Sequence, residues 1–162
     1  MENRTDLTTN TFEATSRNSR AEVEAFLDRF KQVFVKGDVE GVISFYDKDV
    51  IAYDMVPPLE FQGLDAYADS WRKNGGQMPG PWLFETKDER IYCESELAVV
   101  HHLVNCGATG PDGKMMSGWI RHTMTLRRRA GEWTIVHDHF SVPVDMKANK
   151  ALMDLKPETA TH

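Results

Sequence analysis

Asp54 is the residue of this sequence best placed to move a proton. It ends a short β-rich run, residues 49–54, and the apolar residues Met55, Val56 and Pro57 follow it. An apolar environment removes water from a carboxylate and raises its pKa, which prepares an aspartate to act as a general base. The plainer alternative is an aspartate that only caps the turn after the strand.

Arg121 is the second candidate, because it lies in the middle of a predicted strand, between Ile120 and His122. Arginine is uncommon in a central strand unless its charge is paired. The position favours a polar pocket in which Arg121 binds an anionic oxygen. The alternative is a structural salt bridge with Asp54 or Asp138.

The histidines raise the question of a metal site. His137 and His139 alternate along one predicted strand, so both rings point to the same face. Three others lie on neighbouring predicted strands, at His101, His102 and His122. Three histidines on a sheet can bind Zn or Fe, but the spacing also arises easily in a meander, and a dimer interface could use the same residues. We therefore predict no metal.

Helices are predicted ahead of the sheet that must position these residues. A capping-box pattern opens the first helix at Ser19, and apolar residues at helical spacing continue it to Gly37. Asp38 caps a second, shorter helix, and residues 63–73 form a third. Residues 1–18 are polar, rich in Thr and Asn, and show no apolar period, so we expect a flexible N-terminal arm.

The rest of the domain is predicted to form strands. They are expected at about 83–93, 96–107, 115–128 and 132–142, with hairpin turns at Asp112-Gly113 and Ala130-Gly131. Helices followed by an antiparallel meander predict an α+β class, with the helices packed on one face of a curved sheet. The tail, residues 146–162, carries a short helical pattern through Met146, Leu152 and Met153.

Composition argues against several classes of function. The formal net charge is −6 and the one basic run, Arg127 to Arg129, reads as a hairpin end, so we expect no nucleic-acid partner. No apolar run approaches the ~18 residues of a membrane span, and no phosphate loop or nucleotide fingerprint is present, so we expect no membrane and no cofactor. The start is not a signal peptide, which favours a cytoplasmic protein with Cys93 and Cys106 as reduced thiols.

The order of the elements resembles a known family over about residues 20–145. The motifs that carry the resemblance are Lys36-Gly37-Asp38, the helix at 41–46, the strand at 49–54, Gly63-Leu64-Asp65-Ala66 and the final strand at 133–141. They are similar to those of the SnoaL-like and ketosteroid-isomerase-like proteins, within the nuclear-transport-factor-like fold. The resemblance implies a cone, in which a curved antiparallel, partly mixed sheet wraps around N-terminal helices and a central pocket. It also implies a homodimer formed through the outer sheet face, a domain at 19–145, and the tail at 146–162.

The resemblance implies roles for individual positions. In the isomerase branch the residue that ends the first strand is a catalytic Asp, which moves a proton between carbons next to a ketone, and Asp54 matches it. The two donors to the enolate oxygen in that branch, a Tyr and a protonated Asp, fall at Phe30 and Arg121, and a supporting Tyr falls at Trp71. Phenylalanine cannot donate a hydrogen bond and arginine can, so the match implies pocket chemistry other than steroid isomerisation.

The face of the last strand is open to two interpretations. If the isomerase-like register holds, Val136, Asp138 and Phe140 face the pocket, while His137 and His139 face outward. A bulge would exchange the two sets. We favour Asp138 inward.

We therefore expect a cofactor-independent enzyme for a small, largely apolar carbonyl or carboxylate compound, of isomerase, cyclase, dehydratase or hydrolase type. Asp54 would be the general base and Arg121 the anion stabiliser. Further ligand contacts are expected from Phe30, Tyr53, Trp71, His101, Asp138 and Phe140. The alternative is a non-catalytic dimer of the same fold that binds a small ligand or serves in assembly.

Overall fold

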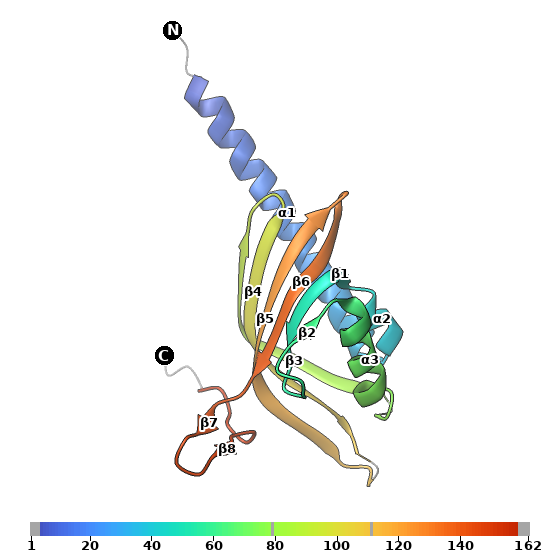
Figure 1. The fold of residues 1–162 in the computed structure, drawn as a ribbon. Helices are drawn as coiled ribbons and strands as arrows, with labels where there is room; N and C mark the ends of the chain where they lie inside the picture. The colour runs from blue at the N-terminus through green and yellow to red at the C-terminus, as the bar shows by residue number, and fades with distance from the viewer. Residues whose placement is uncertain (1–3, 79, 111, 159–162) are drawn as a thin grey trace.

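A curved six-stranded sheet forms the body of the protein (Figure 1). The computed structural model describes residues 4–78, 80–110 and 112–158. The strands are β1 (Tyr46–Tyr53), β2 (Phe61–Gln62), β3 (Trp82–Cys93), β4 (Leu97–Thr109), β5 (Met115–Arg129) and β6 (Glu132–Ser141). Their order is β2-β1-β6-β5-β4-β3, and β1 runs parallel to β6 while the other neighbours are antiparallel. The predicted α+β class with a partly mixed, curved sheet is confirmed.

The helices are α1 (Arg4–Val35), α2 (Val39–Ile43) and α3 (Leu64–Gly75). Gly37, at φ +71°, allows the chain to reverse after α1, because glycine adopts this backbone conformation without strain. Asp38 then caps α2 by accepting a hydrogen bond from the backbone N–H of Gly41 at 2.9 Å. Figure 1 shows α1 passing behind the sheet, with α2 and α3 together beside β1.

The first helix is longer than the sequence indicated. Residues 4–18, part of the segment expected as a flexible arm ahead of the first helix, form the first half of α1. Ser19, where the capping pattern placed the helix start, is instead buried within α1. The segment has no apolar stripe and is rich in Thr and Asn, which have low helix propensity, so the sequence gives little sign of this helix.

The tail also differs from expectation. The helical pattern expected from Met146 onward is replaced by a small hairpin of β7 (Val144–Asp145) and β8 (Lys150–Ala151). The Asp145 carboxylate accepts hydrogen bonds from the backbone N–H groups of Lys147 and Ala148, at 2.8 and 3.1 Å. Such a local side-chain-to-backbone turn competes with helix formation, and it prevailed here.

The turn between β5 and β6 has the expected form. Ala130 and Gly131 have φ values of +51° and +87°, so both central residues are left-handed, as a two-residue hairpin turn requires. This geometry fixes the register in which Arg129 pairs with Glu132.

No helix within the described part of the chain is long and apolar enough to cross a membrane.

The hydrophobic core lies between α1 and the inner face of the sheet. Phe30 is 1% exposed, and its ring meets those of Phe45 and Phe84 edge-on, with centroids 5.3 and 5.9 Å apart. Phe26 meets Phe45 in the same way at 5.1 Å. Edge-to-face aromatic packing at these distances contributes beyond simple burial of area. Phe30, expected to contact a ligand, is therefore a core residue that joins α1 to the sheet.

Replacing Phe30 by alanine should lower the free energy of unfolding by about 3–5 kcal/mol, because it removes a fully enclosed ring and leaves a cavity. Urea unfolding followed by circular dichroism measures the change. Gln32→Ala, at an exposed position on α1, is the matched control and should stay within about 0.5 kcal/mol of the parent. A loss at Phe30 no larger than that of the control would contradict the core assignment.

Candidate functional site

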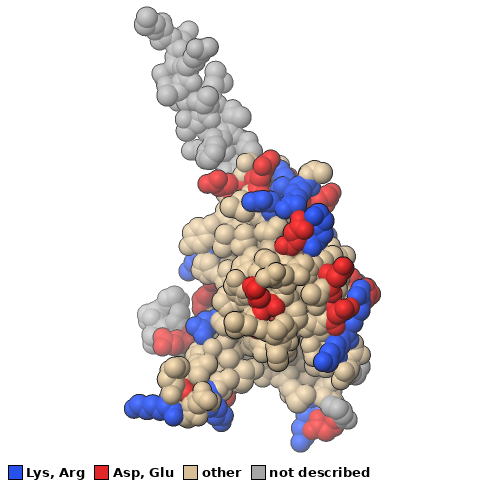
Figure 2. Space-filling model, viewed as in Figure 1, with Lys and Arg blue, Asp and Glu red and all other residues tan. Residues whose placement is uncertain are grey.

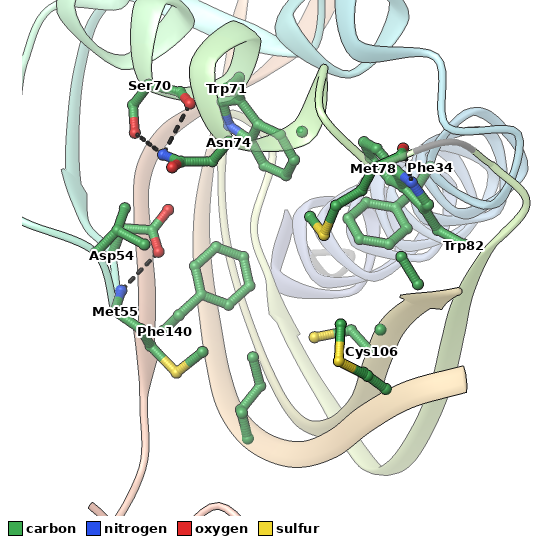
Figure 3. A pocket seen from close by; sticks show the side chains of 16 residues that line it. Phe34, Asp54, Met55, Ser70, Trp71, Asn74, Met78, Trp82, Cys106 and Phe140 are labelled. Atoms are coloured by element: carbon green, nitrogen blue, oxygen red, sulfur yellow. Dashed lines mark hydrogen bonds between the residues drawn. The ribbon is translucent and has the colours of Figure 1, made fainter. Parts of the chain in front are cut away.

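A cavity of about 250 Å³ opens between α3, the segment after β1 and the far ends of β4, β5 and β6. Its wall is mostly apolar, and it is shown in Figure 3. The lining residues are Phe34, Asp54, Met55, Val56, Ser70, Trp71, Asn74, Gly75, Met78, Trp82, Cys106, Gly107, Ala108, Met116, Ile120 and Phe140. Three methionines, Met55, Met78 and Met116, are each at least 42% exposed, so they mark the side of the cavity that meets solvent. The size and the wall suit a small, largely apolar molecule.

Asp54 provides the carboxylate of this cavity, and no other Asp or Glu is among its described lining residues. One carboxylate oxygen accepts from the Tyr67 hydroxyl at 3.0 Å, and the other from the backbone N–H of Met55 at 2.6 Å. Burial raises the pKa of Asp54 above its ordinary value, and the negative charge of Asp138 adds to this rise, while the two hydrogen bonds oppose it. A partly desolvated carboxylate held by two donors has the setting of a general base.

Trp71 brings an unused hydrogen-bond donor to the same cavity. Its indole Nε1 is buried, and it has no hydrogen-bond partner among the described residues. The side chain comes from α3, one turn after Tyr67, and lies beside Asn74 in Figure 3. The ring lines the cavity while Nε1 lies just beneath its surface, and a buried N–H without a partner costs about 1–3 kcal/mol, so a turn of the ring toward a ligand oxygen would relieve that cost.

Cys106 also lines the cavity, but its chemistry differs from that of a nucleophile. Burial raises the pKa of its thiol to about 11. The thiol therefore stays protonated at neutral pH, and the thiolate is the reactive form. Asp54 remains the group that can exchange a proton in the ordinary pH range.

Behind the cavity wall lies a chain of buried polar side chains. Asp138 is fully buried and accepts from the Tyr46 hydroxyl at 2.7 Å, and it also contacts His122 Nε2 at 2.7 Å. His122 Nδ1 meets His102 Nε2 at 3.0 Å, and His102 Nδ1 meets a Glu89 carboxylate oxygen at 3.1 Å. Phe140 stacks on the His122 ring at 4.1 Å and lies between this ring and the cavity.

The structure brings three of the sequence-predicted residues together at the cavity: Asp54, Trp71 and Phe140. Asp138 points inward, as the favoured register of β6 required, but it lies in the buried chain and does not line the cavity. His137 lies toward the opposite face, where its Nδ1 contacts the Ile51 carbonyl oxygen.

Arg121 requires a correction, because the structure places it on the outside of the sheet. Strand alternation points its neighbours Ile120 and His122 inward and leaves Arg121 exposed, so it does not line the cavity. The inward polar residue of this stretch is His122. The position taken for an anion stabiliser is thus one residue away from the position that faces the interior.

Two further predicted contacts also lie on the outer face. His101 is exposed and stacks with Tyr92, with ring centroids 5.7 Å apart, while its neighbour His102 takes the inward place. Tyr53 is 40% exposed and packs against the rings of His137 and His139. Alternation along the strands accounts for both corrections.

Sequence reasoning missed Tyr67 as a functional residue and assigned the supporting-tyrosine position to Trp71. The helical spacing of these two residues, four apart on α3, is the signal that both share one face. Burial raises the pKa of Tyr67 well above its ordinary value, and the charges of Asp138 and Asp54 add to the rise. The Tyr67 hydroxyl therefore stays protonated and donates a hydrogen bond to Asp54 at any ordinary pH.

The histidine pair considered for a metal site lies outside the cavity. His137 and His139 lie 6.3 Å apart between ring centroids, on the outer face. Among the residues that the structure describes, no group of three or more His, Cys, Asp or Glu side chains is placed to hold a metal ion.

Comparison with known proteins places this geometry in a family. Residues 23–145 match the model of the SnoaL-like domain. An NTF2-like protein of unknown function from Pseudomonas putida is 34% identical, over 88% of this chain and 99% of that one, with a TM-score of 0.80. A Novosphingobium aromaticivorans protein whose proposed activity is scytalone dehydration has 12% identity over 93% and 99% of the two chains, with a TM-score of 0.70. The association domain of C. elegans CaMKII has 11% identity over 79% and 98%, with a TM-score of 0.64.

No curated protein sequence matches the chain at a significant level. The two low-identity neighbours support the fold alone. The domain match covers most of the chain, and the Pseudomonas putida structure resembles it in sequence as well as in shape. The chain therefore belongs to the SnoaL-like family, within the NTF2-like fold.

Proposed function

We propose that this protein is a cofactor-independent enzyme that removes a proton from a carbon next to the carbonyl group of a small, largely apolar substrate. The observation that carries the proposal is the partly desolvated Asp54 carboxylate at the wall of an apolar cavity. Loss of such a proton is the shared first step of isomerisation, of aldol-type cyclisation and of dehydration of β-hydroxyketones. The neighbour of proposed dehydratase activity fits this class of reaction.

In this mechanism Asp54 takes the α-proton, and the C–H electron pair moves toward the carbonyl oxygen to form an enolate. A turn of the Trp71 ring brings its Nε1–H, which has no partner among the described residues, to that oxygen, where it donates a hydrogen bond and stabilises the developing charge. Tyr67 holds the carboxylate in place by its hydrogen bond of 3.0 Å. The role first expected of Arg121 passes to Trp71, because only the latter lines the cavity.

The apolar wall contributes by keeping water away from the reacting groups. Met55, Val56, Ile120 and Phe140 surround the cavity near the carboxylate. In a site of low polarity a hydrogen bond to a developing enolate is worth more than in water. The same wall disfavours strongly charged substrates, since no described lining residue is a Lys or Arg.

Hydrogen–deuterium exchange tests the proposal without knowledge of the natural product. Cyclic ketones and β-hydroxyketones, α-tetralone among them, are incubated with the protein in D₂O, and loss of the α-proton signal is followed by NMR. We expect exchange catalysed by the parent protein and reduced about 10²-fold or more in Asp54→Asn. Trp71→Phe keeps an aromatic ring but removes the donor, and should reduce the rate by roughly 10²-fold.

Asp65→Asn, an exposed carboxylate on α3, is the matched control and should leave exchange unchanged. Saturable binding of panel compounds without any exchange would overturn the enzymatic proposal. It would instead favour the alternative, a non-catalytic dimer that captures small ligands. Equal exchange in parent and Asp54→Asn would also reject Asp54 as the base.

The raised pKa of Asp54 has a consequence for stability. A group whose pKa is higher in the folded protein favours folding in its protonated form, so this contribution is lost as pH rises through the folded-state pKa. Asp54→Asn should therefore be more stable than the parent at pH 7, by urea midpoint. The difference should vanish below about pH 3.9, the unfolded pKa of Asp, where the parent carboxyl is also neutral. A less stable variant at pH 7 would contradict the desolvated state of Asp54.

A homodimer formed through the outer sheet face is the expected assembly. Figure 2 shows that the middle of this side of the molecule is largely uncharged, with most Lys, Arg, Asp and Glu side chains around it. The partly exposed aromatic group of Tyr53, His137 and His139 lies on the outer face. The similarity to an association domain supports oligomer formation by this fold. We also propose a cytoplasmic location, where the thiols of Cys93 and Cys106 would stay reduced.

Light scattering should give a mass of twice 18.5 kDa for the parent protein. Tyr53→Glu puts a charge into the proposed interface and should produce monomers, because a buried unpaired carboxylate is strongly disfavoured. Gln32→Glu on α1 is the control and should remain dimeric. A parent protein that is monomeric at high micromolar concentration would reject the dimer.

A further inference from the structure

The chain Asp138–His122–His102–Glu89 crosses the inner face of the sheet from β6 to β3. It lies apart from the cavity, and it is not needed for the proton transfer described above. His122 is 1% exposed and His102 is 5% exposed, so their ring nitrogens depend on one another and on the two carboxylates for hydrogen bonds. The distances along the chain are 2.7, 3.0 and 3.1 Å, and all three are hydrogen-bond distances.

Counting protons along this chain gives a definite result. Each of the three contacts needs one proton between its two heavy atoms, because two lone pairs would otherwise face each other. Two neutral imidazole rings supply one ring proton each, and ionised carboxylates supply none. Three hydrogen bonds therefore require one proton more than two neutral histidines and two carboxylates contain.

The surroundings decide where that proton resides. An imidazole is a stronger base than a carboxylate by about two pKa units, so the proton belongs to a histidine. Burial lowers the pKa of His102, and the hydrogen bond with His102 lowers the pKa of Glu89, so neither group is favoured as the holder of the extra proton. His122 remains, in contact with the fully buried carboxylate of Asp138.

We propose that Asp138, His122, His102 and Glu89 form a second functional site, a buried proton store in which His122 is an imidazolium at neutral pH. His122 Nε2–H donates to Asp138, and His122 Nδ1–H donates to His102 Nε2. His102 Nδ1–H then donates to Glu89. From this state, transfer of the His122 Nδ1 proton to His102 and of the His102 Nδ1 proton to Glu89 leaves both rings neutral and the extra proton on Glu89. Transfer of the His122 Nε2 proton to Asp138 instead puts the extra proton there, and neither change needs a heavy atom to move.

A second cavity gives this site access to solvent. It has a volume of about 250 Å³, lies between α1 and the sheet, and is lined by both His102 and Glu89. The Glu89 side chain is 36% exposed, whereas that of His102 is 2% exposed, so Glu89 is where the chain meets water. The charged groups of α1 that face this cavity are Arg20, Glu24, Asp28 and Lys31.

Two tyrosines connect the other end of the store to the first cavity. Asp138 accepts from Tyr46, whose ring meets Tyr67 edge-on at 5.1 Å, and Tyr67 donates to Asp54. The negative charge of Asp138 raises the pKa of Asp54, and the His122 imidazolium compensates that charge. The store thus influences the pKa of Asp54. This role rests on the proposed function, whereas the proton count does not.

Nitrogen-15 NMR of the histidine rings measures the count directly. An imidazolium has protons on both nitrogens and similar shifts for the two, whereas a neutral ring gives two widely separated shifts. The protein has six histidines, and the variants His102→Gln and His122→Gln identify the two relevant rings. We expect both ring nitrogens of His122 to carry protons at pH 8. Two neutral rings at that pH overturn the proposal.

Glu89→Gln tests the reason for the extra proton. An amide N–H can donate to His102 Nδ1, and two neutral rings then satisfy every contact, so the imidazolium should be lost at pH 8. Glu85→Gln, an exposed change on the same strand, should retain it. Retention of the imidazolium in Glu89→Gln would show that the number of protons required by the three hydrogen bonds does not determine the protonation state of the two rings.

Carbon-13 NMR of the Asp54 carboxyl then tests the coupling between the two sites. Removing a negative charge at Glu89 would by itself lower the pKa of Asp54. If the imidazolium leaves with it, Asp138 is uncompensated and the Asp54 midpoint should move to higher pH instead. A downward shift rejects the coupling. Because neither experiment uses turnover, failure of the proposed reaction would leave both results readable.

Discussion

The buried carboxylate of Asp138 is the constraint around which the interior is organised. It is 0% exposed and accepts hydrogen bonds from two different strands, through Tyr46 of β1 and His122 of β5. An ionised group in such a place is stable only when its partners are held within hydrogen-bond reach, which fixes how β1, β6 and β5 lie relative to one another. The parallel pairing of β1 with β6 brings Tyr46 to this point, and the same strand delivers Asp54 to the cavity.

The fold divides the interior into an apolar part and a polar part that share one wall. Phe140 stacks on His122 on one side and lines the cavity on the other. This ring keeps the histidines away from a ligand while leaving their charge close to it. The charge of the histidines therefore still affects the electrostatic potential inside a cavity whose wall is mostly apolar, because electrostatic interactions act over longer distances than packing does.

Much of the fold follows from local patterns in the sequence, but the site follows only in part. The long strands, the Ala130-Gly131 turn and the α+β class depend on alternation and turn chemistry, which are local. Asp54 could be found because it stands at a strand end before apolar residues. Arg121 lies on the outer face because apolar residues of β5 such as Ile120 and Met124 alternate inward, a local pattern that outweighs the family match at this position. On β4 both faces carry apolar residues, so alternation in the sequence does not show which face His101 takes. The link between Tyr46, His122 and Asp138 joins residues up to 92 positions apart, which no spacing rule reveals.

The three methionines at the open side of the cavity have a further consequence. Met55, Met78 and Met116 are flexible and polarisable, so the entrance can adjust to ligands of different outline, and selection by shape falls to the aromatic wall deeper inside. Their exposure also opens them to oxidants. Conversion of a thioether to a sulfoxide makes an apolar side chain polar, so oxidative stress would alter the wetting of the entrance while Asp54 itself stayed chemically intact.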